Sequence, residues 1–139
     1  MKNKSFYLIT LFLFKAAVGS ILLLVGWDII GFSKDSSYNV SLITGLAFLP
    51  AAFAKPLYNK LSHLSDSFVA STSLIVSSTL VIFEWLYLNS NIKNIYLFAI
   101  IHFILWIFIF LIETFLERWF VSINESSSDI DIKNLSGLS

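Results

Sequence analysis

The sequence contains no cysteine and only two histidines, and both scarcities narrow the chemistry open to the protein. Without cysteine there is no disulfide, no thiolate metal site and no redox pair. The two histidines, His63 and His102, lie in separate regions, and neither an H-E-x-x-H motif nor a glycine-rich phosphate loop occurs. We therefore predict no enzyme, no metal site and no cofactor.

Charged residues are also scarce. They make up 13% of the 139 residues, whereas hydrophobic residues make up 57%. A globular domain in water has roughly 25% charged residues. The nine basic and nine acidic residues balance, so no basic surface indicates a nucleic-acid partner. The composition predicts a protein whose main partner is the lipid bilayer.

The charges gather in short breaks between apolar runs of about bilayer length. A helix needs about 20 residues, at 1.5 Å rise each, to cross the hydrocarbon core. The breaks predict four spans, at about 5–27, 37–54, 67–88 and 94–117. The runs are continuously apolar, which favours helices over the alternating strands of a membrane barrel. We expect an all-α fold, with a four-transmembrane-helix domain over 1–120 and a polar, solvated tail over 121–139.

The amino terminus has a second interpretation, as a secretory signal. Lys2 and Lys4 precede an apolar run, as in a signal peptide. The run resumes after Lys15 and continues to Trp27, and no convincing small-x-small cleavage site ends it. This pattern favours a retained first span.

The positions of lysine and arginine predict the orientation of the spans. Lys34 and Lys93 fall on one side of the membrane. Six basic residues near span ends fall on the other side: Lys2, Lys4, Lys55, Lys60, Arg118 and Lys133. Basic residues accumulate in cytoplasmic connections. We therefore expect a multi-pass protein of the cell membrane, with both termini and the connection from Lys55 to Asp66 in the cytoplasm.

Both prolines lie at the connection between the second and third spans. This connection contains Phe48, Leu49, Pro50, Pro56 and Leu61, and Asp66 lies at its end. These residues match a family pattern similar to F-L-P, a few apolar residues, then G-P-x-x-G-x-L-x-D-R-x-D-R, in which Asp66 falls at the second acidic position. The segment resembles the connection between the second and third helices of major facilitator superfamily transporters, particularly the drug-efflux branch related to macrolide pumps. The region after Arg118 is similar to the linker before the fifth helix of such transporters. The resemblance implies that the chain corresponds to the amino-terminal four of the family's twelve helices.

Several positions depart from the family's pattern. Lys55 and Asn59 replace its two glycines, and His63 replaces the first aspartate. Leu64 and Ser67 replace the two arginines. In the family, these glycines let neighbouring helices touch, and the aspartate and arginine hold the cytoplasmic gate. We therefore expect a weakened or absent gating network, with His63 as a solvated loop residue rather than a pH sensor.

Lys15 is the most unusual residue inside a predicted span. It lies eleven residues after Lys4, about 16 Å along the helix and close to the bilayer centre, where a lysine costs about 2.5–3.5 kcal/mol. We expect it to face protein or water, or to reach partway towards the interface along its own stem. Gly19 and Gly26 share its helix face and predict that a neighbouring helix comes close there.

The fourth span carries a matching polar stripe. His102, Trp106, Glu113 and Glu117 fall within about 60° of one another on one helix face. In the family that the chain resembles, the first and fourth helices line the central substrate cavity. Lys15, His102, Trp106 and Glu113 are therefore candidates for that cavity. An amphipathic helix that merely packs against its neighbours would show the same stripe.

Depth estimates separate the charged residues of different spans. By helical rise, Glu113 lies about 10 Å nearer the cytoplasm than Lys15, so a direct ion pair is not assured. Glu84 lies about 10 Å nearer the outside, and its neighbour Trp85 is typical of the outer interface. We therefore expect Glu84 at that interface as well.

Two functional interpretations follow. The resemblance implies the amino-terminal part of an efflux transporter, which is not transport-competent with four helices and whose partners are the remaining transporter helices. The alternative is a small accessory or immunity-type membrane protein without transport activity, which acts with another membrane protein. A self-assembling small multidrug transporter also has four spans, but the acidic residue usual in its first span is missing here.

Overall fold

The computed structural model describes residues 2–30, 36–61, 63–91 and 94–136, with side chains over 4–30, 37–61, 63–91 and 94–125. These residues form five helices and no strand. The helices are α1 (Lys2–Ile30), α2 (Ser36–Phe48), α3 (Ala51–Lys60), α4 (Asp66–Leu88) and α5 (Ile95–Ser136). The prediction of an all-α fold is therefore confirmed for the described residues.

Four helical segments are long and apolar enough to cross a membrane. They are Lys4–Ile30, Ser37–Lys60, Asp66–Leu88 and Ile95–Glu125. Large apolar side chains such as Phe12, Leu23 and Trp27 are exposed on the outside of the bundle. Such a surface suits lipid rather than water. By the length and composition of its helices, the chain matches the prediction of a multi-pass membrane protein with four spanning helices.

The second span consists of two helices, α2 and α3, which are separated by Leu49 and Pro50. Proline has no amide hydrogen, so Pro50 cannot continue the hydrogen bonds of α2 and instead precedes α3 as its cap residue. The Pro50 carbonyl accepts from the amide of Ala54 at 2.9 Å, which starts α3. This helix continues to Lys60, with Pro56 inside it. The connection expected from Lys55 onwards is thus helical over its first residues, and the span passes its expected end at 54.

A short polar connection fixes α4 against α5. Tyr87, in the last turn of α4, donates its hydroxyl hydrogen to the Asn94 carbonyl at 2.9 Å and accepts from the Asn94 amide at 3.0 Å. The Asn94 side chain accepts from the amides of Tyr96 and Leu97 and so caps the start of α5. Tyr87 therefore holds the end of one helix in register with the beginning of the next.

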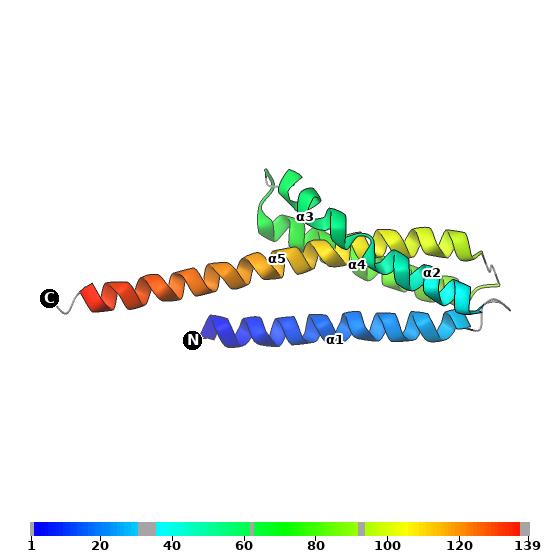
Figure 1. Cartoon of the computed structure of the whole chain (residues 1–139), viewed down its shortest axis with the longest axis horizontal. Helices are drawn as coiled ribbons and strands as arrows, with labels where there is room; N and C mark the ends of the chain where they lie inside the picture. Colours follow the sequence, from blue (N-terminus) through cyan, green and yellow to red (C-terminus); the bar gives the residue numbers. More distant parts are fainter. Residues whose placement is uncertain (1, 31–35, 62, 92–93, 137–139) are drawn as a thin grey trace.

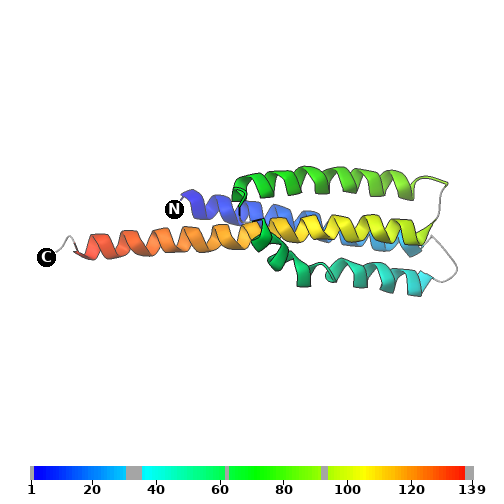
Figure 2. The same cartoon turned by 90° about the horizontal axis from the view of Figure 1, so that it is seen from above.

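The central helix of the bundle is α5. It contacts each of the other four helices, and α1 also packs against α2. Figure 2 shows α2 and α4 on opposite sides of α5, and Figure 1 shows α1 running along one face of the bundle. Side chains with no exposed surface include Ile29, Ala47, Phe98 and Leu105, from α1, α2 and α5. The core is thus built around α5.

The amino end of α1, the α3–α4 connection and the carboxyl half of α5 lie at the same end of the bundle (Figure 1). The last helix extends past Glu117, the expected end of the fourth span, and continues to Ser136. The change of composition after Phe120 therefore does not end the helix, and the polar tail begins as its continuation. Lys34 and Lys93, the basic residues expected on the opposite side, lie outside the described residues.

Candidate functional site

Three polar side chains form a hydrogen-bonded chain in the centre of the bundle. His102 Nδ1 lies 2.9 Å from Glu84 Oε1, and Trp106 Nε1 donates to His102 Nε2 at 2.8 Å. The His102 side chain is 0% exposed and the Glu84 side chain 3%. His102 and Trp106 lie one turn apart on α5, whereas Glu84 reaches them from α4. The chain joins these two helices through groups that are shielded from the surroundings.

Aromatic rings continue this chain in both directions along α5. The Phe98 ring, one turn before His102, stacks on the imidazole with centroids 5.7 Å apart. The Phe110 ring lies one turn after Trp106, also with centroids 5.7 Å apart. A polar group in such surroundings depends on its protein partners, because no water replaces a lost hydrogen bond.

Glu84 is buried inside the bundle, in the last part of α4, while the adjacent Trp85 is 62% exposed. The expectation that Glu84 lies at the depth of the outer interface stays a prediction. The spacing of α4 carried a signal, since Ser73, Ser77 and Glu84 share one face and all three are buried. Ser77 donates to the carbonyl of Leu74 in its own helix rather than to a neighbour. Two small serines on a buried face indicate that the glutamate on that face also points inwards.

Lys15 of α1 and Glu113 of α5 form an ion pair between the first and fourth spans. The Lys15 side chain is 54% exposed and the Glu113 side chain 26%. The two residues meet despite the depth difference estimated from helical rise, because both side chains are long enough to reach along their helices. The pair gives each charge a partner within spans that are otherwise apolar.

The two glycines on the Lys15 face do not bring a helix close. A Cβ atom built on Gly19 or Gly26 would meet no other atom within 4 Å. The expectation of close helix contact at these positions is therefore wrong. The first two helices pack instead through larger side chains, which include Val25, Ile29 and Ile43.

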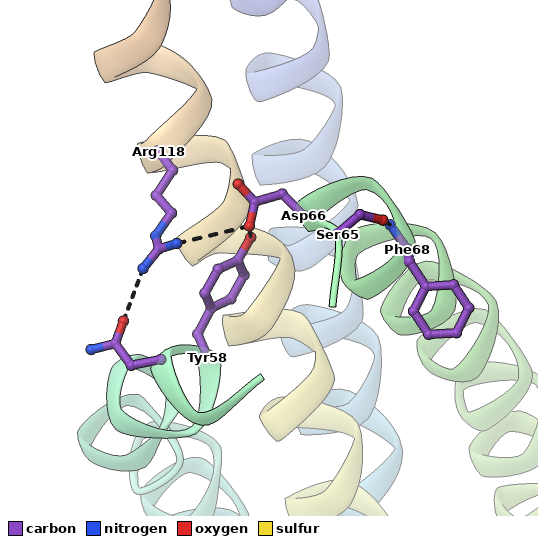
Figure 3. A network of polar contacts seen from close by, with 6 residues as sticks. Tyr58, Ser65, Asp66, Phe68 and Arg118 are labelled. Carbon is purple, nitrogen blue, oxygen red and sulfur yellow. Dashed lines mark hydrogen bonds and ion pairs between the residues drawn. The ribbon is translucent and has the colours of Figure 1, made fainter. Parts of the chain in front are cut away.

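A second polar network joins α3, α4 and α5 beside the α3–α4 connection (Figure 3). The Tyr58 hydroxyl donates to Asp66 Oδ1 at 3.0 Å, and Arg118 Nη2 donates to Asn59 Oδ1 at 2.9 Å. Arg118 Nη1 lies 3.8 Å from the same Asp66 oxygen, and the guanidinium carbon lies 4.6 Å from the centre of the Tyr58 ring. One arginine of the fourth span thus contacts both sides of the connection.

The remaining polar residues of this connection serve the helix ends. The Ser65 hydroxyl accepts from the Phe68 amide at 3.2 Å and caps α4 (Figure 3). His63 is exposed, and its Nδ1 lies 3.1 Å from the carbonyl of the last residue of α3. The expectation of a weakened or absent gating network stays a prediction. The family's aspartate–arginine pair within the loop is absent, but Asp66 has a basic partner in Arg118 of α5.

Grooves lie between the described helices, and two of them are larger than a third groove. An apolar groove of about 470 Å³ lies between α1, α4 and α5, where its walls include Phe14 and Leu74. A polar groove of about 300 Å³ lies between α3 and α5, where its walls include Lys55 and Arg118. None of the four predicted cavity residues lines either groove. Two of them fill the core and the other two pair with each other.

Among the residues that the structure describes, no three histidine, aspartate or glutamate side chains are placed to hold a metal ion. Compared with family models, curated proteins and solved structures, the chain matches none. The class therefore rests on the fold and its contacts: an all-helical, multi-pass membrane protein with four helices that can span the bilayer.

Proposed function

We propose that this protein resides in the cell membrane, corresponds to the amino-terminal four helices of a facilitator-type efflux transporter, and does not transport a substrate by itself. The observation that carries the proposal is the Lys15–Glu113 ion pair between the first and fourth spans. In the family that the sequence resembles, these two spans line the substrate cavity. Charged residues inside spans are more often functional than structural, because they are costly to keep there.

The network at the α3–α4 connection supports the same proposal. Asn59 and Asp66 occupy positions of the family's loop motif, and Arg118 of the fourth span contacts both. Contacts of this kind hold the ends of helices together in one state of a protein and break in another. In this chain Arg118 takes the part that the loop arginines take in the family.

Transport by the isolated chain is not expected. Alternating access requires one bundle of helices to move against another around a shared site. The described helices form a single bundle, whose interior is filled by its own side chains, His102 and Trp106 among them. Expression of the chain alone in bacteria that lack efflux pumps should therefore give neither drug resistance nor dye efflux. An intact efflux transporter at the same membrane level is the positive control, and efflux by the chain alone would contradict the proposal.

The packed centre also favours a second function, that of a self-contained accessory or immunity-type membrane protein. A bundle whose core is filled by its own side chains needs no further helices to complete it. Such a protein acts through a separate membrane complex. Crosslinking in native membranes followed by purification should then recover one defined partner. A protein that stays monodisperse and partner-free would argue against this alternative.

The proposed orientation can be tested without background, because the chain has no native cysteine. His63 and Asn91 are exposed at connections on opposite ends of α4. Asn91→Cys should react with a membrane-impermeant maleimide in intact cells, whereas His63→Cys should react only after permeabilisation. The reverse pattern would place both termini outside the cytoplasm.

A further inference from the structure

The Glu84–His102–Trp106 chain fixes the protonation of its central imidazole. An indole nitrogen can donate but not accept, so His102 Nε2, 2.8 Å from Trp106 Nε1, must accept and carries no proton. The proton of the neutral ring is then on Nδ1, which donates to Glu84 Oε1 at 2.9 Å. If the ring were an imidazolium, its Nε2–H would point at the Nε1–H of Trp106, and two donors would face each other. The geometry therefore holds one tautomer of neutral His102 and excludes the cation while Trp106 stays in place.

This arrangement leaves Glu84 as the group that determines the charge of the site. A carboxylate with 3% of its side chain exposed is costly inside a membrane protein, whereas a carboxylic acid there is neutral. The second oxygen of the carboxyl group can take up one proton without disturbing the bond to His102. Glu84 and His102 share one hydrogen bond, so their protons belong to a coupled pair rather than to either residue alone.

The helices α1 and α2 place apolar side chains beside this site. Val25 of α1 and Ala47 of α2 are buried apolar side chains in the clusters on either side of His102. The charged residue of α1 nearest to Val25, Asp28, is exposed. The described residues of α2 include no charged side chain, and the one titratable residue among them, Tyr38, is exposed.

The two helices that form the site add no competing charge either. Tyr87 of α4 is the titratable group next along that helix, and its hydroxyl is bonded to Asn94. On α5, Tyr96 is exposed. Glu113 lies about 16 Å along the helix from His102 and is paired with Lys15. Glu84 and His102 therefore form a buried, hydrogen-bonded pair of ionisable groups with no other charged side chain placed beside it among these residues of the four helices.

We propose that Glu84 and His102 form a proton-binding site in the centre of the bundle, and that the Trp106 indole restricts it to states with a neutral imidazole. The first proton binds to the Glu84 carboxyl group, and no other bond breaks. A proton can bind to His102 Nε2 only after the Trp106 N–H leaves and its ring turns. Trp106 belongs to the same apolar cluster as Ala47 of α2 and Val18 of α1, so this turn changes the contacts among three helices.

The tautomer can be measured in a protein with a single histidine. His63 is exposed in the α3–α4 connection, so His63→Gln leaves His102 as the one imidazole without touching the core. Nitrogen NMR of ¹⁵N-histidine-labelled protein in lipid bilayers reports which ring nitrogen carries the proton. At neutral pH we expect a protonated Nδ1 and an unprotonated Nε2. The opposite tautomer, or an imidazolium at neutral pH, would overturn the proposal.

The restraint by Trp106 can be measured in the same background. Trp106→Phe keeps an aromatic ring but removes the N–H donor, which favours neutral His102. The nitrogen spectrum of this variant at neutral pH should therefore show a fraction of His102 with a protonated Nε2, which the parent with Trp106 lacks. Trp85→Phe, at an exposed position of α4, is the matched control and should leave the spectrum unchanged. An unprotonated Nε2 in both variants would show that Trp106 imposes no restraint.

Proton uptake by Glu84 has its own readout. Infrared difference spectra between high and low pH should show a protonated carboxyl band that is lost in Glu84→Gln. The amide oxygen of glutamine still accepts from His102 Nδ1, so this variant keeps the hydrogen bond that supports folding. If the band is absent from the parent protein at every pH, or persists in Glu84→Gln, the proton-binding site is not at Glu84. These measurements use the chain alone and do not depend on whether it takes part in transport.

Discussion

The two polar networks of the bundle use similar groups in opposite surroundings. Glu84, His102 and Trp106 lie in the packed centre, whereas Arg118 and Asp66 have side chains that are 45% and 51% exposed. At the exposed network water can replace a lost partner, so each contact adds little stability. In the centre nothing replaces it, and the remaining group stays unsatisfied. Burial rather than the number of contacts decides which network stabilises the fold.

The largest loss of stability should follow truncation of the buried indole of Trp106. Trp106→Ala removes a ring that is 3% exposed and leaves His102 Nε2 without its donor, so we expect a loss of about 3–5 kcal/mol in the free energy of unfolding. Titration with a denaturing detergent in mixed micelles measures this loss. Trp85→Ala, on the outer surface, is the control and should cost far less. Equal losses would remove the distinction between the two networks.

Two substitutions of Glu84 distinguish whether its hydrogen bond to His102 or its charge stabilises the centre of the bundle. Glu84→Leu leaves the His102 Nδ1 proton without an acceptor, so about 1–3 kcal/mol of stability should be lost. Glu84→Gln keeps an acceptor of nearly the same shape and should lose less. The same mixed-micelle titration compares the variants. A glutamine variant as unstable as the leucine variant would mean that the negative charge, not the hydrogen bond, stabilises the site.

The Lys15–Glu113 pair is the intermediate case, because it lies within the spans but is partly exposed. A double-mutant cycle with Lys15→Ala and Glu113→Ala should give a coupling energy of about 1 kcal/mol, within the range of polar contacts between membrane helices. Unfolding of the single and double variants supplies the four values required. Additive losses would show that the two charges are stabilised by their surroundings rather than by each other.

Substitution of Arg118 should have the smallest effect on the free energy of unfolding. Its main effect should be to loosen the α3–α4 connection. Arg118→Ala removes the contacts with Asn59, Asp66 and Tyr58, and we expect a loss of about 0.2–1 kcal/mol that shrinks as salt is added. Hydrogen exchange of the α3–α4 connection should rise in this variant. Arg118→Lys keeps the charge but not the planar fork, so it should restore exchange protection only in part. Full protection in Arg118→Ala would exclude Arg118 as a clamp on the connection.

The sequence allowed the membrane class and the shared face of the fourth span to be predicted, because both follow from composition and helical periodicity. The spacing of Ser73, Ser77 and Glu84 places them on one face of α4, and this was the sequence signal for the face that the structure buries. The pairing of Glu84 with His102 was not predictable. It depends on the rotation and vertical offset of α4 against α5, which the Tyr87–Asn94 contact sets and which no periodicity within one helix reports.

Other differences between the sequence-based expectations and the structure have the same cause, because contacts between helices do not follow from the pattern within one helix. A depth estimate from helical rise treats each helix as upright and each side chain as a point, so it missed the contact of Lys15 with Glu113. The contacts of Arg118 were not predictable, since its partners Asn59 and Asp66 lie about 50 to 60 residues away in the chain. Both prolines were expected at the connection, but α3 starts one residue after Pro50, so Pro50 and Pro56 lie within the second span.

The central position of α5 has a consequence for biosynthesis. A chain is synthesised from its amino terminus, so the first three spans enter the membrane before the helix that contacts all of them. The helices α1 and α2 can pair early, whereas α4 must wait for its main neighbour. During that interval Glu84 lacks His102, and the third span resides in lipid with an unpaired acidic group. Delay or arrest of translation before α5 would therefore expose a polar residue that membrane quality control can recognise.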